Sequence, residues 1–337
     1  MRRGRLFLCA FVLLLGYSLV CGAGGVFVAE AALHPGRRWL KESDRQQAAL
    51  MAERHGAALT DADVVGADGS ELRGWLLQPR QGNHDFVMLL HGLSDNRTGM
   101  IGYAEMFVNR GYGVLMADAR AHGASSGLLA SYGLVESEDI RRWFEWLSER
   151  EHPRCIYGFG ESMGAGQLLQ SLSTEDGFCA VAAESSFSTF REIAYDRVGQ
   201  AFHTGPWLGR SVLRPLVEVA FVYAKWKYEL DFEQVSPDRV IAASRVPVLL
   251  IHGEQDSNIP VRHSRKIAAD DPSVTLWVVP GAEHCGAVSI APGEFERRVV
   301  GWFEGHGAEH PEVANAVRAS KTLKAQRTAG QSVGKAF

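Results

Sequence analysis

The chain lacks the sequence motifs that identify most nucleotide-dependent and zinc-dependent enzymes. Its 337 residues contain neither a phosphate-binding loop of the form G-x-x-x-x-G-K-[ST] nor an H-E-x-x-H zinc motif. Gly158 and Gly160 do not complete a dinucleotide-binding pattern, because Met163 occupies the place of the third glycine. His306 and His310 lie in a stretch with little apolar periodicity, which is a poor setting for a metal site. We therefore expect neither a cofactor nor a metal.

An excess of positive charge is also absent. The formal net charge is −4, so the composition does not favour binding to nucleic acid. The sequence shows no repeats of solenoid length. With 46% hydrophobic residues, a chain of this length can bury a large core as one domain with insertions or as two smaller domains.

The longest apolar run lies at the N-terminus. After the basic residues 1–5, the stretch 6–33 is apolar apart from Glu30. Residues 6–28 supply the roughly 20 apolar residues that a membrane-spanning helix needs, so we interpret 1–33 as a retained membrane anchor. The alternative is a signal peptide cleaved at the A-E-A sequence of residues 29–31, which would leave a secreted protein. In both cases the arginines stay cytoplasmic and the rest is exported, to the periplasm or outside the cell.

The chain has only 5 cysteines, two of them in the apolar N-terminus. Cys155 and Cys179 each open a predicted strand and lie at similar distances before a serine at the end of that strand. If the two strands are parallel neighbours in register, a disulfide between them is geometrically feasible and suits an exported protein. Two buried free thiols are the alternative, and the sequence leaves both open.

Beyond residue 56 the chain alternates between strands and helices. Residues 34–56 are polar and helical in character, and we interpret them as a segment that connects the anchor to the domain over its surface. Residues 57–80 predict a hairpin at the edge of a sheet. Short apolar runs predict strands buried on both faces at 85–90, 112–117, 155–162, 180–183, 246–251 and 274–279. Helical stretches between them predict a doubly wound, mostly parallel α/β sheet in one domain over 57–304.

Two segments depart from this alternation. Residues 187–243 are rich in aromatic and aliphatic side chains at helical spacing, and they predict a helical cap inserted over the C-terminal edge of the sheet. The apolar side chains either pack there or line a substrate pocket, and the position between two strands favours a lid. Residues 305–337 are rich in Ala, Lys, Gly and Ser, and they predict a disordered tail.

The sequence G-E-S-M-G at 160–164 joins a predicted buried strand to a predicted helix. A serine at so sharp a turn needs glycine two residues before and after it, because a Cβ there would meet the neighbouring strand or helix. The turn raises the hydroxyl of Ser162 above the sheet edge, at a helix N-terminus that favours negative charge. Ser162 is therefore our candidate nucleophile. A second match, G-A-S-S-G at 123–127, has no strand leading into it, so we interpret Ser125 as part of a loop.

Ser162, Asp256 and His284 each follow a predicted strand. Acyl transfer requires a nucleophile, a base to take its proton and a carboxylate to orient the base, and this set supplies one of each. Asp256 lies in a turn directly after a buried strand, whereas Asp270 and Asp271 end a helix. The order Ser, Asp, His along the chain is the one that this type of sheet uses. We therefore predict that these three residues form a catalytic triad.

Together these motifs resemble those of the serine hydrolases of the α/β-hydrolase superfamily. The resemblance spans about residues 60–304 and depends on H-G-L at 91–93, D-A-R-A-H-G at 118–123, G-E-S-M-G at 160–164, H-G-E-Q-D at 252–256 and G-A-E-H at 281–284. It implies an α/β-hydrolase fold with a helical cap, and an oxyanion hole made by the backbone N–H groups of Leu93 and Met163. The branch it most resembles contains small esterases, lysophospholipases and S33-like peptidases, some with an N-terminal anchor. We interpret three further residues as structural, tying loops together: Asp118, Arg120 and His122.

We thus predict a membrane-anchored serine hydrolase that cleaves an ester or related acyl bond of a small or lipid-like substrate. Ser162 is the nucleophile, His284 the base and Asp256 the orienting acid. Peptidase, thioesterase and acyltransferase activities use the same triad and remain alternatives, as does a non-catalytic binding module on the same fold.

Overall fold

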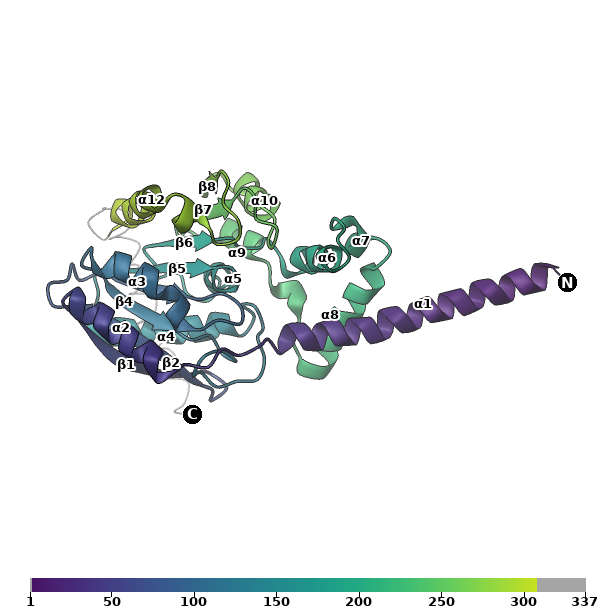
Figure 1. The fold of residues 1–337 in the computed structure, drawn as a ribbon, viewed down its shortest axis with the longest axis horizontal. Helices are drawn as coiled ribbons and strands as arrows, with labels where there is room; N and C mark the ends of the chain where they lie inside the picture. Colours follow the sequence, from purple (N-terminus) through teal and green to yellow (C-terminus); the bar gives the residue numbers. More distant parts are fainter. Residues whose placement is uncertain (1, 308–337) are drawn as a thin grey trace, which may run out of the picture.

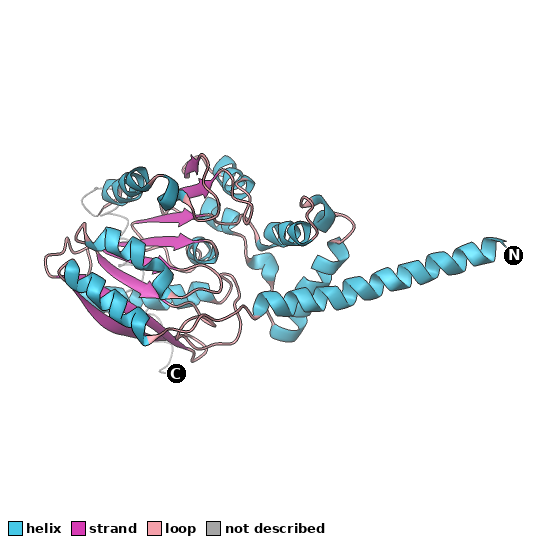
Figure 2. Ribbon diagram, viewed as in Figure 1, coloured by secondary structure: helices cyan, strands magenta, loops and turns pink. Residues whose placement is uncertain are grey.

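An eight-stranded sheet forms the centre of the molecule, which the computed structural model describes for residues 2–307 (Figures 1 and 2). The strand order is β1-β2-β4-β3-β5-β6-β7-β8. β2 runs antiparallel to both of its neighbours, and the other adjacent pairs are parallel. The strands are β1 (Ala57–Val65), β2 (Glu71–Pro79), β3 (Phe86–Leu90), β4 (Gly113–Ala117), β5 (Ile156–Glu161), β6 (Ala180–Glu184), β7 (Val248–Gly253) and β8 (Thr275–Val279). The predicted mostly parallel α/β fold is confirmed.

Helices cover both faces of the sheet, because its central strands are buried on both sides. Every residue of β3, β4, β6 and β7 is buried, which explains their continuous apolar sequences. One face is covered by α2 (Glu42–Arg54), the turn η1 (Arg97–Met100), α3 (Ile101–Val108), α11 (Ala287–Ile290) and α12 (Pro292–Gly305). The other face is covered by α4 (Glu136–Glu151), α5 (Met163–Ser171), α9 (Pro237–Ala243) and α10 (Arg262–Asp270).

Helix α2, within the segment 34–56, packs against the sheet. Within α2, the side chains of Ala48, Met51 and Ala52 are buried in the core on one face of the sheet. Their spacing of three and four residues places them on one side of the helix. The predicted helical character is present in 42–54, but the short apolar stripe that packs α2 against the sheet is inconspicuous among polar residues.

A helical cap lies between β6 and β7 in the chain. It consists of α6 (Phe190–Ala201), α7 (Trp207–Arg210), α8 (Arg214–Tyr228) and the turn η2 (Phe232–Gln234). Aromatic rings hold it together: the ring centroid of Phe190 lies 4.5 Å from that of Phe232 and 6.0 Å from that of Phe221. The predicted insertion is present, but it is shorter than 187–243, because α9 packs with Ile241 in the core on the sheet.

A buried carboxylate attaches the cap to the sheet layer. Asp196 of α6 accepts a hydrogen bond from Nε2–H of His263 at 2.7 Å and one from Arg262 at 2.6 Å, both on α10. Burial opposes ionisation of this carboxyl, but its two partners outweigh burial and lower the pKa of Asp196. Because Asp196 is buried, loss of both partners would leave its charge without compensation.

The longest helix, α1 (Arg2–Leu33), projects away from the cap end of the molecule (Figure 1). By length and composition Gly4–Leu33 could cross a membrane, with a mean hydropathy of 2.4 in its most apolar window. Residues 4–20 are exposed, but the second half of the helix packs against α8. Its buried residues recur at every fourth position and so share one face: Cys21, Gly25, Ala29 and Leu33.

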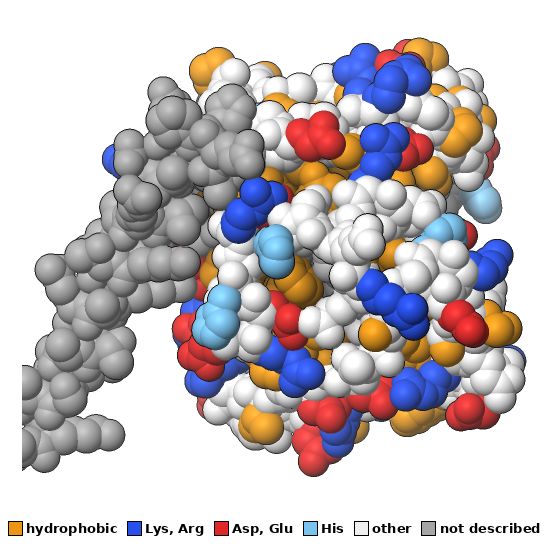
Figure 3. Space-filling model, turned by 90° about the vertical axis from the view of Figure 1, so that its left-hand side faces the viewer, with side chains coloured by type: hydrophobic (Ala, Val, Ile, Leu, Met, Phe, Trp, Pro, Cys, Tyr) orange, Lys and Arg blue, Asp and Glu red, His pale blue; other side chains and the backbone are white. Residues whose placement is uncertain are grey.

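The face turned away from α1 has a different character. Over the described part of that face, acidic and basic side chains are interspersed among apolar and neutral ones (Figure 3). Most of the exposed large apolar side chains belong instead to α1 and the cap. Apolar surface is therefore concentrated at one end of the molecule.

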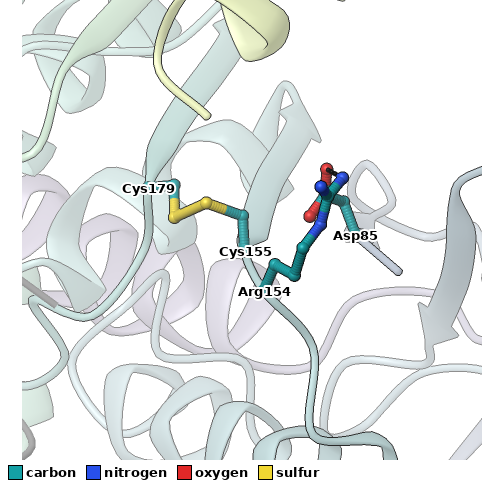
Figure 4. Close-up of a disulfide and its surroundings, with 4 residues drawn as sticks. All are labelled: Asp85, Arg154, Cys155 and Cys179. Atoms are coloured by element: carbon teal, nitrogen blue, oxygen red, sulfur yellow. Dashed lines mark hydrogen bonds and ion pairs between the residues drawn. A yellow bond between two sulfur atoms is a disulfide. The ribbon is translucent and has the colours of Figure 1, made fainter. Parts of the chain in front are cut away.

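A disulfide joins Cys155 and Cys179 at the starts of β5 and β6, with the Cα atoms 5.7 Å apart (Figure 4). The two strands are parallel neighbours in which Tyr157 lies opposite Ala180, so the cysteines are offset by one residue and are still close enough to be joined. Of the two alternatives for these cysteines, the structure contains the disulfide. Beside it, Arg154 forms an ion pair with Asp85 at 3.1 Å.

The prediction of a disordered tail concerns residues 305–337. Helix α12 extends to Gly305, and residues 308–337 lie outside the described part of the chain.

Candidate active site

Ser162 lies at the sharp turn between β5 and α5. Its backbone has φ 52° and ψ −115°, a strained conformation for a residue with a side chain. A Cβ on Gly160 would lie 2.6 Å from the carbonyl oxygen of Gly164, and one on Gly164 would lie 2.3 Å from that of Leu90. Both glycines are therefore required by close backbone contacts, as the sequence predicts.

A chain of hydrogen bonds connects Ser162 to His284 and His284 to Asp256. The hydroxyl of Ser162 donates to Nε2 of His284 at 2.8 Å. The Nδ1–H group of the same imidazole donates to Oδ2 of Asp256, also at 2.8 Å. This arrangement fixes one tautomer of the neutral imidazole, in which Nε2 is free to accept the serine proton.

Asp256 is buried in a turn that keeps it ionised. Its Oδ1 accepts the backbone N–H groups of Asn258 at 2.9 Å and Ile259 at 2.8 Å. Burial alone would raise the pKa of Asp256, but interactions with His252 and His284 and these N–H groups hold the pKa well below its usual range. The carboxylate is therefore charged at neutral pH and can stabilise a protonated His284.

His252 stabilises this turn through hydrogen bonds. From the sequence it was only one residue of a motif. Its Nε2–H group donates to the carbonyl of Ile259 at 2.7 Å, and Nε2 lies 3.4 Å from Oδ2 of Asp256. Its Nδ1 accepts the hydroxyl proton of Ser264 at 2.7 Å. The signal was the H-G-E-Q-D sequence, in which a histidine ending a buried strand precedes the acid by four residues.

The two residues expected to form an oxyanion hole lie near Ser162. Leu93 and Met163 line the same cavity as Ser162. A Cβ on Gly92 would lie 3.6 Å from the Cβ of Ser162, which places the loop after β3 against the nucleophile turn. Met163 begins α5, and the first N–H groups of a helix have no partner within it.

The loop after β4 is structural, as its polar residues suggested. Asp118 is buried and accepts hydrogen bonds from the backbone N–H and the guanidinium of Arg97, both at 2.7 Å. Arg120 donates two hydrogen bonds of 2.7 Å to Asp139. Ser125, the serine of the second G-x-S-x-G match, donates to the carbonyl of Asp118 at 2.8 Å. Each group holds the loop together, and the hydrogen-bond partners of the Ser125 hydroxyl within residues 2–307 are backbone groups of Asp118 and Arg73.

Two carboxyl groups, from the half-buried Glu161 and the buried Glu184, lie next to the nucleophile turn, and no sequence pattern predicts that they meet. The hydroxyl of Tyr103 is 3.3 Å from a carboxyl oxygen of Glu161 and 3.3 Å from one of Glu184. Burial is the main cause that raises the pKa of Glu161 to about 6 and that of Glu184 to about 7. The backbone N–H of Ser162 donates to the carbonyl of Glu184, so this pair adjoins the catalytic turn.

Cys285, next to His284, lies in surroundings that disfavour its thiolate form. Burial and the nearby carboxyls of Glu161 and Glu184 raise the pKa of its thiol well above the usual value, so the thiol stays protonated. Among residues 2–307, no group of three or more His, Cys, Asp or Glu side chains is arranged to hold a metal ion.

A cavity of about 150 Å³ lies over Ser162, between the sheet edge and the cap. Nearly all of its lining is apolar, with side chains from α6, α8 and the start of α5. A cavity of this size accepts a group such as benzene, so it has room for a short apolar chain or ring.

The sheet order, the cap and the serine turn together define an α/β-hydrolase type of protein. Residues 87–298 match the Alpha/beta hydrolase family, and this match covers more than half of the chain. The protein therefore belongs to the Alpha/beta hydrolase family, and this membership supports a hydrolase activity.

Individual relatives agree with this assignment. The chain is 28% identical over 225 residues to the uncharacterized protein YqkD of Bacillus subtilis. The matched region covers 66% of this chain and 71% of that protein. It is 25% identical over 202 residues to the lysophosphatidylserine lipase ABHD12 of Danio rerio, covering 57% of this chain and 49% of that protein. The solved structure of an esterase from Pyrococcus furiosus shares the fold, with a TM-score of 0.63 and 23% identity over 81% of this chain and 97% of that chain.

Proposed function

We propose that the protein is a serine hydrolase that cleaves an ester or related acyl bond through an acyl-enzyme intermediate. The observation that carries this proposal is the pair of 2.8 Å hydrogen bonds that connects Ser162, His284 and Asp256. The Ser162 oxygen attacks the acyl carbonyl while its proton passes to Nε2 of His284. Asp256 keeps the imidazole oriented and stabilises its protonated form. His284 then protonates the leaving oxygen, and later deprotonates the water that releases the acid.

The tetrahedral intermediate carries an oxyanion that needs hydrogen-bond donors. We assign this role to the backbone N–H groups of Leu93 and Met163, which belong to two residues of the cavity that contains Ser162. Each such donor typically contributes about 10²–10³ in rate.

The lining of the cavity is apolar, and this favours an acyl group with an apolar chain or ring. That group would bind beside Ser162. The name of the zebrafish relative, a lipase for a lysophospholipid, is in keeping with a lipid-like ester. Peptide, thioester and acyl-transfer reactions use the same three residues and differ in the leaving group or acceptor.

We further propose that α1 anchors the protein in a membrane and that the catalytic domain is exported. The basic residues before the apolar run favour the cytoplasmic side for the N-terminus. The disulfide between Cys155 and Cys179 is in keeping with an oxidising compartment for the domain.

The test is pre-steady-state hydrolysis of p-nitrophenyl acetate by the full-length protein in detergent. An acyl-enzyme mechanism produces a burst of about one p-nitrophenolate per active site when deacylation is slower than acylation. Ser162→Ala should abolish the burst and the steady-state rate, whereas Ser125→Ala, in the second G-x-S-x-G match, should retain both. Hydrolysis that survives in Ser162→Ala would contradict the proposal.

A further inference from the structure

Part of the wall of the cavity over Ser162 comes from the helix that the sequence identifies as an anchor. Val28, Ala29, Ala32 and Leu33 of α1 line this cavity together with residues of the cap. The cavity therefore depends on a segment more than 120 residues away from Ser162 in the chain.

Small residues bring α1 into close contact with α8. A Cβ added to Gly25 would lie 2.7 Å from the backbone oxygen of Leu216 and 2.7 Å from the Cβ of Val219. Ala29, one helical turn further on, is 5% exposed. Small residues four positions apart are typical of helices whose backbones pack closely, so this is a built interface and not a loose tether.

The one acidic residue of the apolar run reinforces that interface. The carboxylate of Glu30 accepts hydrogen bonds from the hydroxyl of Tyr223 at 2.5 Å, from Nζ of Lys227 at 2.8 Å and from the hydroxyl of Tyr228 at 2.8 Å. All three partners lie on α8, so the charge that interrupts the apolar sequence is satisfied by the cap.

Hydrogen bonds also fix the C-terminal end of α1 over the catalytic domain. The hydroxyl of Tyr132 donates to the carbonyl of Ala32 at 2.7 Å. The backbone N–H of Ala130 donates to the carbonyl of Leu33 at 2.9 Å. These carbonyls belong to the last turn of the helix and have no partner within it. The position of the cavity wall is thus set from both the cap and the sheet domain.

The same end of the molecule exposes apolar side chains that a membrane would cover. Phe27 of α1 is 74% exposed, and Trp226 of α8 is 78% exposed. Tryptophan is enriched at the boundary between lipid and water. Val28 both lines the cavity and retains 38% exposure, so the cavity adjoins this apolar surface.

We propose that α1 is a wall of the acyl-binding pocket as well as an anchor, and that the substrate is an ester with an apolar chain drawn from the lipid phase, the part of the chain next to the carbonyl lying in the cavity. Val28, Ala29 and Ala32 then determine which chain lengths are accepted. This inference rests on the proposed function, because it assumes an acyl group at Ser162. It also implies that the helix is retained, since cleavage after Ala31 would remove Val28 and Ala29 from the pocket.

The test compares kcat/KM of the full-length protein for p-nitrophenyl acetate and p-nitrophenyl decanoate in detergent micelles. Ala29→Phe and Ala32→Phe place a ring in the cavity, and Ala31→Phe places the same ring on the exposed side of the same turn. Each buried methylene contributes about fourfold, so excluding two of them should lower the decanoate-to-acetate ratio about fifteenfold. The Ala31→Phe ratio should stay within about twofold of the parent. Val28→Ala enlarges the cavity and should raise the ratio.

Labelling with a small fluorophosphonate separates the possible failures. If Ala29→Phe and Ala32→Phe are labelled on Ser162 but keep the parent ratio, the inference is wrong and the proposed function stands. If the parent protein is neither labelled nor able to hydrolyse the acetate ester, the proposed function fails and the inference fails with it. If the two Phe variants do not fold, Val28→Ala decides, because an unchanged ratio in that smaller variant refutes the role of α1.

Discussion

Replacing Glu184 with glutamine is expected to stabilise the protein at alkaline pH. Glu184 ends β6 with its carboxyl buried behind the nucleophile turn. Burial raises its pKa from 4.5 to about 7, the N–H of Ala287 opposes this shift, and the neighbouring carboxyl of Glu161 adds to it. In the unfolded chain the same carboxyl would titrate near its ordinary value.

The direction and size of the effect follow from this difference. Between pH 4.5 and pH 7 the folded protein holds a proton on Glu184 that the unfolded chain has released, so the free energy of unfolding decreases as the pH rises through this window. A difference of about 2.5 pKa units corresponds to about 3 kcal/mol, all of it lost by pH 8. Glutamine cannot ionise, and its Oε1 can still accept the N–H of Ala287. The smaller pH dependence from Glu161, with a pKa of about 6, should remain.

The assay is thermal unfolding followed by circular dichroism at pH 4 and pH 8. At pH 8 the midpoint of Glu184→Gln should exceed that of the parent by roughly 6–12 °C, and at pH 4 the two should agree. Glu149→Gln, at an exposed position of α4, is the matched control and should follow the parent at both pH values. Equal pH dependence in the parent and Glu184→Gln would refute the account of this buried carboxyl.

Other predictions concern the triad, the turn and the disulfide. Asp256→Asn should lower kcat for p-nitrophenyl acetate by about 10⁴ with little change in KM, because the imidazole loses its tautomer; a loss below tenfold would argue against its assigned role. Gly164→Ala should lower the unfolding midpoint and abolish ester hydrolysis, since its Cβ would lie 2.3 Å from a backbone oxygen, whereas Gly301→Ala in open space should do neither. The double substitution Cys155→Ser and Cys179→Ser should decrease the free energy of unfolding, measured in urea, by about 3 kcal/mol, because the disulfide closes a loop with a sequence separation of 24. An unchanged free energy of unfolding would show that the disulfide does not constrain the unfolded chain.

The features that could be predicted from the sequence are those in which backbone geometry dictates the residue type. The strands buried on both faces appear as short apolar runs because the helices cover both sides. Gly160 and Gly164 mark the serine turn because any Cβ there would meet a backbone atom. These constraints are local, so the glycine pattern alone predicts the position of Ser162 at the turn. The positions of Asp256 and His284 at strand ends predict that they lie near it.

The features that could not be predicted depend on which distant surfaces meet. An apolar helix has the same sequence whether lipid or protein surrounds it, so the contact of α1 with the cap was not foreseen. Glu30 was the available signal, because a carboxylate in such a run requires partners, and those lie on α8. The state of Cys155 and Cys179 depended on strand register, which only the structure supplies. The pairing of Glu161 with the buried Glu184 arises because the ends of two neighbouring strands lie side by side.

Covalent labelling of the full-length protein tests the central claim most directly. A fluorophosphonate reacts with a serine whose proton is accepted by a positioned base, and mass spectrometry of the digested protein identifies the modified residue. The account predicts one adduct, on Ser162, that is lost in His284→Ala. An adduct on another serine, labelling of Ser162 that persists in His284→Ala, or no labelling of the folded protein would contradict it.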